Sequence, residues 1–372
     1  MKILKEIIWL TPDLSGLGGS EYMVTSFCRL LQRSGIHVHM ITSAVHPSWK
    51  QVLGLNHAPG QIHLHEVGSF EWRDFAAVVD QITRSTSISL MQVMPLETFC
   101  FDIIRFKKYD FPVCGLEPTD LSDQCWWLPE NLAQVMQQLD GLLVLNPHAE
   151  TTARSRHHFL KPIQLIANTV MHDLYTTSDH TYPPTTFGCI SRLSAEKGLE
   201  YLLGAMRLLS DRQPLLSLGI WGEGEDRERL LNQAKMLGIE EQVHFHGAFH
   251  PFKDSLAITA SAAVFVLPSL FEGCPVSLLE LAGRKKPVIS TATSGGKWLL
   301  GEDYPGLVPV ADTGSLAQRM ERAFTDHTFR AQLTGCLQER LDTWFSNAVT
   351  SQQLIAFYSN MVAAYHNCIP AE

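Results

Sequence analysis

Two carboxylates, Glu272 and Glu280, lie eight positions apart, with a glycine between them and an apolar run before them. Residues 263–267 (AVFVL) end at a Pro-Ser pair, which predicts a buried strand leaving a sheet. A helix is expected to begin near Val276. Open α/β sheets bind ligands at the carboxyl ends of their strands, where the N–H groups of a helix start favour anions. Carboxylates among such donors suit a ligand with hydroxyls and a phosphate, such as a nucleotide sugar.

Two cations occupy another predicted strand-to-helix loop. Residues 191–198 (SRLSAEKG) follow a predicted strand at 187–191 and contain Arg192 and Lys197. Two positive charges at the carboxyl end of a strand would hold a diphosphate and stabilise a departing nucleotide. A solvated pair of loop charges is the alternative interpretation.

Two glycine turns have the same setting between strand and helix. Residues 16–21 (GLGGSE) contain Gly18 and Gly19, which would let the backbone approach a phosphate. Residues 222–226 (GEGED) contain Gly222. Neither turn has the G-x-G-x-x-G spacing or the P-loop pattern, and an ordinary tight turn explains either one alone.

Histidines occur in three His-x-His pairs: His37 with His39, His63 with His65, and His244 with His246. In a strand both rings of a pair would point to one face, where a metal ion can bind. The sequence offers no obvious third ligand near any pair. We therefore expect no metal at these histidines.

Composition excludes several classes of protein. The 372 residues suffice for two domains, and the net charge of -9 argues against a nucleic-acid binder. No apolar run approaches the roughly 20 residues that span a bilayer, and residues 1–10 read as a buried strand and not a signal peptide. Eight cysteines without a C-x-x-C pair suggest reduced thiols in the cytoplasm.

The stretch 105–111 (RFKKYDF) favours a solvated surface, with a peripheral contact to an anionic membrane or acceptor as the alternative.

Alternating strands and helices must position these loops. In the second half the predicted strands cover 187–191, 216–221, 243–247, 263–267 and 287–291, with helices between them. Repeated β-α units with short links predict a doubly wound parallel sheet. The first half repeats this pattern less clearly, with strands at 6–11, 38–42, 89–93, 113–116 and 141–145. The polar stretch 176–186 (TTSDHTYPPTT) is the expected linker.

Taken in order, these motifs resemble the GT-B glycosyltransferases, in particular the retaining family 4. The likeness rests on GLGGSE, SRLSAEKGL, IWGEGEDRERL, VHFHG and FEGCPVSLLE, the last with the spacing E-x7-E. It implies an α/β protein of two Rossmann-like domains with doubly wound parallel sheets facing a central cleft. The acceptor-side domain would span 1–178 and the donor domain 185–346, and a crossover helix at 347–372 would pack on the first domain.

The resemblance also implies roles for single residues. Arg192 and Lys197 would grip the donor diphosphate and Glu272 would bind the transferred sugar, which makes these three residues the catalytic group. Glu280 would bind the ribose. The other implied donor-site residues, which meet the sugar, the phosphates or the base, are Gly18, Gly19, Gly222, His246, Gly273, Cys274, Pro275 and Val276.

The chain departs from the family pattern mainly in its first half. Many relatives carry a histidine where residues 113–120 (VCGLEPTD) have none, so Glu117 or Asp120 would substitute on the acceptor side. Asn168-Thr169 stands where Asn-Gly is frequent, and Lys297 where a glutamate is frequent. A nucleotide-sugar epimerase and a non-catalytic sugar-binding subunit on the same fold therefore remain alternatives. The glycine spacing disfavours a nicotinamide dehydrogenase.

The resulting expectation is a retaining hexosyltransferase that moves a sugar from a nucleotide diphosphate sugar to an acceptor hydroxyl. The acceptor would be a surface polysaccharide, a lipopolysaccharide or another lipid-linked glycan at the inner face of the membrane. The sequence contains no D-x-D motif, so we expect neither a metal nor any cofactor besides the donor. The donor base, the sugar and the oligomeric state do not follow from the sequence.

Overall fold

The computed structural model describes residues 4–54, 59–96, 109–122, 128, 130–176 and 180–367. The chain forms two compact units: unit 1 comprises Met1–Thr169 with Asn347–Glu372, and unit 2 comprises Val170–Ser346. The division falls before the stretch 176–186 that the sequence suggests as the linker, and residues 177–179 of that stretch lie outside the described residues. Residues 105–108 of the basic and aromatic stretch also lie outside them.

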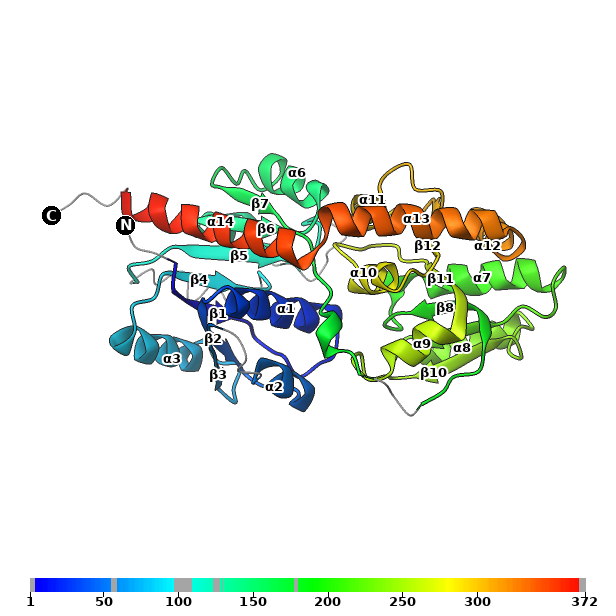
Figure 1. Ribbon diagram of the computed structural model, residues 1–372, viewed down its shortest axis with the longest axis horizontal. Coiled ribbons are helices and arrows are strands. Elements are labelled where there is room, and N and C mark those ends of the chain that lie inside the picture. The colour runs from blue at the N-terminus through cyan, green and yellow to red at the C-terminus, as the bar shows by residue number, and fades with distance from the viewer. Residues whose placement is uncertain are drawn as a thin grey trace. The chain divides into compact units, whose positions relative to one another are not determined.

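The described part of unit 1 contains a seven-stranded parallel sheet in the order β3-β2-β1-β4-β5-β6-β7 (Figure 1). Its strands are short and largely buried, as expected where helices cover both faces of a parallel sheet. The strands are β1 (Glu6–Leu10), β2 (His37–Thr42), β3 (Ile62–Glu66), β4 (Leu90–Val93), β5 (Val113–Glu117), β6 (Gly141–Val144) and β7 (Ile163–Leu165). The helices are α1 (Gly19–Arg33), α2 (Pro47–Leu53), α3 (Trp72–Ser85), α5 (Leu132–Met136), α6 (Pro147–Ser155) and α14 (Asn347–Asn367).

The last helix, α14, packs on unit 1. Tyr358 donates a buried hydrogen bond of 2.7 Å to the side-chain oxygen of Gln92 in β4. Gly141 begins β6 so close to α14 that a Cβ atom there would meet the sulfur of Met361 at 2.6 Å. The C-terminal segment is therefore part of the core of unit 1, although more than 170 residues separate it from the rest of that unit.

The described part of unit 2 contains a six-stranded parallel sheet in the order β10-β9-β8-β11-β12-β13. The strands are β8 (Thr185–Ile190), β9 (Leu218–Trp221), β10 (Val243–Gly247), β11 (Ala262–Leu267), β12 (Val288–Thr291) and β13 (Leu307–Val308). The helices are α7 (Leu199–Ser210), α8 (Arg227–Met236), α9 (Ser255–Ser261), α10 (Val276–Gly283), α11 (Ser294–Leu300), α12 (Thr313–Thr325) and α13 (His327–Trp344).

The strand order of unit 2 reverses direction between β8 and β11. The chain builds outward from β8 to β10 on one side and then returns to place β11 on the other side of β8. In doubly wound sheets such a switch point opens a crevice at the carboxyl ends of the two strands, because their following helices lie on opposite faces. The loops after β8 and β11 are those that contain Arg192 with Lys197 and Glu272.

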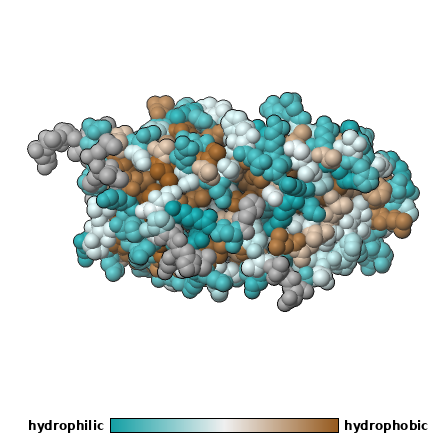
Figure 2. All heavy atoms as spheres, in the orientation of Figure 1, coloured by the Kyte–Doolittle hydropathy of each residue, from teal (hydrophilic) through white to brown (hydrophobic). Residues whose placement is uncertain are grey.

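The described surface mixes polar and apolar residues, as Figure 2 shows for one face. Exposed apolar side chains are normal on a folded protein. Within the described ranges, no helix combines the length and the apolar character that crossing a membrane requires. The cysteines of the same ranges are free thiols, and Cys28, Cys114, Cys189 and Cys274 are buried.

Candidate functional site

The loops after β8 and β11 are fastened to each other. The backbone N–H of Leu270 donates to the carbonyl oxygen of Glu196 at 2.8 Å. Gly198 has a φ of +59°, and a Cβ atom there would meet the carbonyl oxygen of Pro268 at 2.4 Å. Glycine at position 198 therefore allows both the left-handed backbone and the close approach of the two loops.

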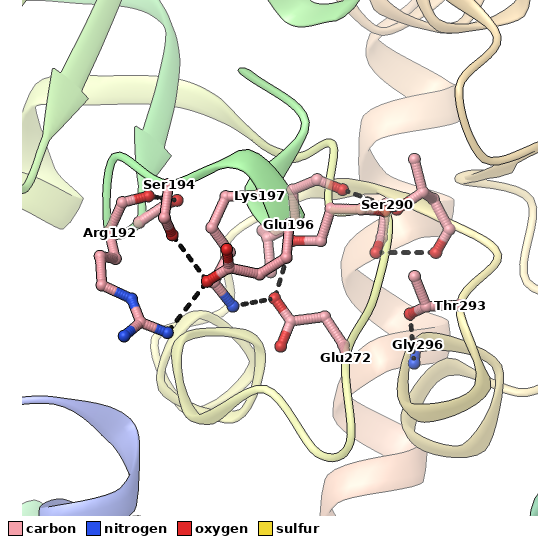
Figure 3. Close-up of polar contacts among 12 residues, drawn as sticks. Arg192, Ser194, Glu196, Lys197, Glu272, Ser290, Thr293 and Gly296 are labelled. Carbon is pink, nitrogen blue, oxygen red and sulfur yellow. Dashed lines mark hydrogen bonds and ion pairs between the residues drawn. The ribbon is translucent and has the colours of Figure 1, made fainter. Parts of the chain in front are cut away.

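Lys197 and Glu272 meet where these loops join (Figure 3). The Lys197 Nζ atom lies 2.7 Å from Glu272 Oε1, and the two side chains are 18% and 15% exposed. Ser269 Oγ donates to the same carboxylate oxygen at 2.7 Å. A charge-assisted hydrogen bond at this distance is strong, so the pair orients both side chains at the switch point.

Arg192 lies on the same loop as Lys197 and is bound by Glu196. Its guanidinium donates to Glu196 Oε1 at 2.9 Å, while 67% of the Arg192 side chain remains exposed. Ser194 Oγ donates to the same Glu196 oxygen at 2.6 Å. Burial would raise the pKa of Glu196, but the Ser194 and backbone hydrogen bonds and the charges of Arg192 and Lys197 lower it below its usual value. Glu196 is thus an anion that positions Arg192, a role that the sequence motif did not indicate.

The segment after Glu272 packs against the start of α11. Gly295 donates its N–H to the carbonyl oxygen of Glu272 at 2.9 Å. A Cβ atom at Gly295 would meet the carbonyl oxygen of Gly273 at 2.4 Å, so this approach also requires glycine. The next residues, Gly273 to Pro275, lead into α10, whose Ncap is Pro275 and whose first helical residue is Val276.

Cys274 is buried in this segment. The amino end of α10 has a partial positive charge from its aligned peptide dipoles, which favours an anion near residues 273–276. The segment therefore places a helix start beside the Lys197–Glu272 pair.

Glu280 lies on α10 and is buried. The hydroxyl of Tyr175 donates a short hydrogen bond to its Oε1 atom. The guanidinium of Arg284 lies over the Tyr175 ring, 4.3 Å from its centroid. Burial raises the pKa of Glu280, although the Tyr175 hydrogen bond and the Arg284 charge oppose part of that shift. Tyr175 is a second contact that the sequence could not indicate, because it lies 105 positions from Glu280.

Gly222 and His246 mark the carboxyl ends of β9 and β10. Gly222 has a φ of +141°, and a Cβ atom there would meet the carbonyl oxygen of Ser191 at 1.9 Å. The His246 ring stacks on the indole of Trp221 with centroids 4.6 Å apart. Burial and then the neighbouring His244 lower the pKa of His246, so this ring is neutral at neutral pH. The two positions thus supply a tight turn and an aromatic face in unit 2.

The predicted site residues of the first half lie in unit 1. Gly18 is the Ncap of α1 and Gly19 is its first residue. Glu117 ends β5, is buried, and accepts a hydrogen bond of 3.0 Å from the backbone N–H of Leu96. Asp120 is also buried and accepts one of 3.0 Å from the backbone N–H of Ser122. Each of these carboxylates therefore holds a loop at the carboxyl edge of the sheet.

Comparison with known sequences gives a family match for most of the second unit. Residues 184–326 match the family described as glycosyl transferases group 1. The putative colanic acid biosynthesis glycosyltransferase WcaL of Escherichia coli (strain K12) is 32% identical over 174 residues, 44% of this chain and 42% of that protein. The lipopolysaccharide core biosynthesis glycosyltransferase LpsE of Rhizobium meliloti (strain 1021) is 30% identical over 167 residues, 44% of this chain and 47% of that protein. The chain thus spans less than half the length of these relatives.

Comparison with solved structures extends over both units. Sucrose-phosphate synthase (tll1590) from Thermosynechococcus elongatus matches with a TM-score of 0.79 at 19% identity, covering 97% of this chain and 100% of that one. Anabaena Alr3699/HepE, solved in complex with UDP and glucose, matches with a TM-score of 0.76 at 17% identity, covering 95% and 99%. The sequence prediction of two doubly wound parallel sheets is confirmed. Residues 184–326 match the glycosyl transferases group 1 family, and the chain has the GT-B fold.

Proposed function

We propose that this chain is a glycosyltransferase that moves a sugar from a nucleotide diphosphate sugar to an acceptor hydroxyl, with retention at the anomeric carbon. The observation that carries the proposal is the Lys197–Glu272 ion pair at the switch point of unit 2, with Arg192 on the same loop. The family match of residues 184–326 and the UDP bound by Alr3699/HepE support the same reaction class.

The charges of the site suit the two ends of such a donor. Arg192 and Lys197 offer two cations for a diphosphate, and the amino end of α10 adds partial positive charge beside them. Glu272 offers carboxylate oxygens to sugar hydroxyls. Lys197 and Glu272 already neutralise each other. When the donor binds, its phosphate would replace Glu272 as the partner of Lys197, and a sugar hydroxyl would replace Lys197 as the partner of Glu272. Glu280 on α10 would accept hydrogen bonds from the ribose hydroxyls in place of the one from Tyr175.

The proposed chemistry rests on positioning and on charge stabilisation. The bond between the anomeric carbon and the diphosphate oxygen breaks, and the acceptor oxygen attacks from the same face while its proton passes to the leaving phosphate. Arg192 and Lys197 stabilise the charge that the diphosphate gains, an effect worth on the order of 10²- to 10³-fold in rate for one donor in comparable sites. These two cations would do this work without a metal ion, so we propose a metal-independent reaction.

A ligand screen followed by a matched pair of variants tests the proposal. The melting temperature with UDP, GDP, ADP and CMP identifies the base, because a ligand that binds the native state raises it. Transfer from the corresponding sugar donor is then measured for the wild type, Glu272→Ala and Glu321→Ala. Glu321 pairs with Arg212 at 3.1 Å elsewhere in unit 2, which makes it a control for loss of an ion pair. Full activity in Glu272→Ala would reject the assignment.

Finer parts of the proposal need their own measurements. The NMR coupling of the anomeric proton in the product reports retention, and activity after treatment with a chelator reports metal independence. For the acceptor we propose a surface polysaccharide or lipid-linked glycan at the cytoplasmic face of the membrane, since the two relatives above are named for colanic acid and lipopolysaccharide core biosynthesis. Incubation of the donor without any acceptor separates transfer from epimerisation, because an epimerase would convert the donor alone.

A further inference from the structure

Unit 1 gathers histidines and a carboxylate that the proposed reaction does not use. Glu6 of β1, His39 of β2 and His63 of β3 offer ligand atoms that all lie within 4.8 Å of one another. The expectation that no third ligand lies near the histidine pairs is therefore wrong for two of them. It failed because the sequence does not show that β1, β2 and β3 are neighbours in the sheet.

Strand register explains why these side chains meet. His39 pairs with His63 across β2 and β3, and Glu6 pairs with His37 across β1 and β2. Residues in register on neighbouring parallel strands point to the same face, and residues two apart on one strand do so as well. Glu6, His37, His39, His63 and His65 therefore share one face of the sheet.

The contacts within this group already resemble those around a metal ligand. His39 Nε2 lies 2.8 Å from Glu6 Oε1, and the side chains of His39 and Glu6 are 10% and 25% exposed. The His39 and His63 rings stack with centroids 4.8 Å apart. On its other side, His39 Nδ1 lies 3.2 Å from His65 Nε2. A histidine that binds a metal through one ring nitrogen usually donates from the other, which fixes its tautomer and orientation.

The group lies at the end of the sheet opposite the predicted acceptor-side residues. Glu6 and His37 are the first residues of β1 and β2, whereas Glu117 is the last residue of β5. All strands of this sheet are parallel, so Glu6 and His37 lie at its amino-terminal edge, and His39 and His63 lie within two residues of the start of their strands. Ligand sites of doubly wound sheets occur at the carboxyl edge. The histidine group is therefore a separate feature.

We propose that Glu6, His39 and His63 form a binding site for a divalent transition metal ion, with Zn²⁺ as the ion that the ligands suit best. Imidazole nitrogen and carboxylate oxygen bind zinc at about 2.0–2.2 Å, which sets tetrahedral ligand atoms roughly 3.3 Å apart. The contact between Glu6 and His39 is already near that separation. Rotation of the half-buried His63 ring brings in the third ligand, and His65 serves as the outer hydrogen-bond acceptor for His39.

A plain hydrogen bond with stacked rings is the competing explanation, and the surroundings favour a metal over it. Ligand atoms from three neighbouring strands lie within 4.8 Å of one another, whereas a hydrogen bond alone accounts only for the contact between Glu6 and His39. His37, whose ring stacks on that of His63 with centroids 6.4 Å apart, or a water molecule would supply the fourth position.

The consequence of zinc binding would be structural. β3 is an edge strand of the sheet, so only one side of its backbone pairs with a neighbouring strand. One ion would link β3 to β2 and β1 and would stabilise unit 1 by an amount that rises with the logarithm of the free zinc concentration once this exceeds the dissociation constant. This inference does not depend on the proposed glycosyltransferase activity.

Direct titration tests the site. The full chain is stripped with a chelator, and zinc binding is measured by isothermal titration calorimetry for the wild type, Glu6→Gln, His63→Gln and His244→Gln. His244 belongs to the third His-x-His pair, in unit 2, and serves as the matched control. We expect one zinc per chain and an unchanged affinity in His244→Gln. Loss of an outer partner of a metal site weakens binding about 10- to 100-fold, so loss of a ligand in Glu6→Gln or His63→Gln should weaken it at least as much.

A second readout keeps the test decisive if a variant folds poorly. X-ray absorption on the zinc-loaded wild type should show at least two imidazole nitrogens and one carboxylate oxygen within bonding distance. Zinc should also raise the melting temperature of the wild type and of His244→Gln but not that of His63→Gln. Equal affinity in all four proteins, or no zinc binding by the wild type, would overturn the proposal.

Discussion

The replacement Lys197→Met separates what the central ion pair does for stability from what it does for the reaction. At the 2.7 Å between Lys197 Nζ and Glu272 Oε1, the bare attraction is about 6 kcal/mol at an effective dielectric constant of 20. Desolvation offsets most of this attraction, because both side chains are more than four-fifths buried. An exposed ion pair contributes about 0–1 kcal/mol to the free energy of unfolding, and breaking a buried pair costs about 3–5 kcal/mol. The Lys197–Glu272 pair lies between these cases, so we expect the replacement to lower the free energy of unfolding by about 2 kcal/mol.

The retained Ser269 contact limits that loss, because its hydroxyl still donates to Glu272. A loss of about 2 kcal/mol lowers the melting temperature of a domain this size by roughly 4–8 °C. The effect on the reaction should be larger. Removing a charge that stabilises the departing diphosphate should lower kcat by about 10²- to 10³-fold, equivalent to about 3–4 kcal/mol.

The assay is the initial rate of nucleotide diphosphate release, measured well below the melting temperature of every variant. Arg212→Met is the matched control, because Arg212 pairs with Glu321 at 3.1 Å and is 64% exposed. We expect the control to lose less than about 1 kcal/mol of stability and to keep the wild-type activity. If Lys197→Met has a lower melting temperature but keeps the wild-type kcat, the ion pair only stabilises the fold and the proposed charge stabilisation is wrong.

Three further changes have defined outcomes. Gly198→Ala should destabilise unit 2 by roughly 1–3 kcal/mol, read from urea unfolding, because its φ of +59° and the Pro268 carbonyl oxygen leave no room for a Cβ atom; an unchanged midpoint would contradict this. Glu280→Gln should be more stable than the wild type at neutral pH yet bind the nucleotide more weakly. Because burial raises the pKa of Glu280, the stability of the wild type should fall as the pH rises from the ordinary glutamate pKa through the raised one. If the melting temperatures of the wild type and Glu280→Gln depend on pH in the same way, this reasoning is wrong. Tyr358→Phe should cost about 1–3 kcal/mol in thermal melts because it leaves the buried Gln92 oxygen without its donor; an unaltered melting temperature would show that this bond is not needed.

Local pattern was sufficient for most of the fold. The predicted strands at 243–247 and 263–267 correspond to β10 and β11, and the helix expected near Val276 begins at that residue. Residues 263–267 are an apolar run that ends at Pro268, and residues 243–247 alternate apolar residues with histidines and end at Gly247. β3, β7 and β13 were missed. β3 alternates histidines with apolar residues and has no glycine or proline at its end, whereas β7 and β13 have only three and two residues.

Motif spacing likewise placed Arg192, Lys197, Glu272 and Glu280 in strand-to-helix loops or on the helices that follow. A residue's distance along the chain from the end of a strand is a local property, and the sequence contains it. The partners of these side chains are not local. Lys197 meets Glu272 across 75 positions, and Tyr175 meets Glu280 across 105.

Strand order is the reason for this difference. β8 lies beside β11 although two strands separate them in the chain, and this juxtaposition creates the Lys197–Glu272 pair. In the same way, the adjacency of β1, β2 and β3 turns two scattered histidine pairs and Glu6 into one group. Residue types and short spacings can indicate which side chains are chemically able to act. Which of them touch depends on how the strands are ordered and registered, because contact requires neighbouring strands to bring distant residues to one face or one edge of a sheet.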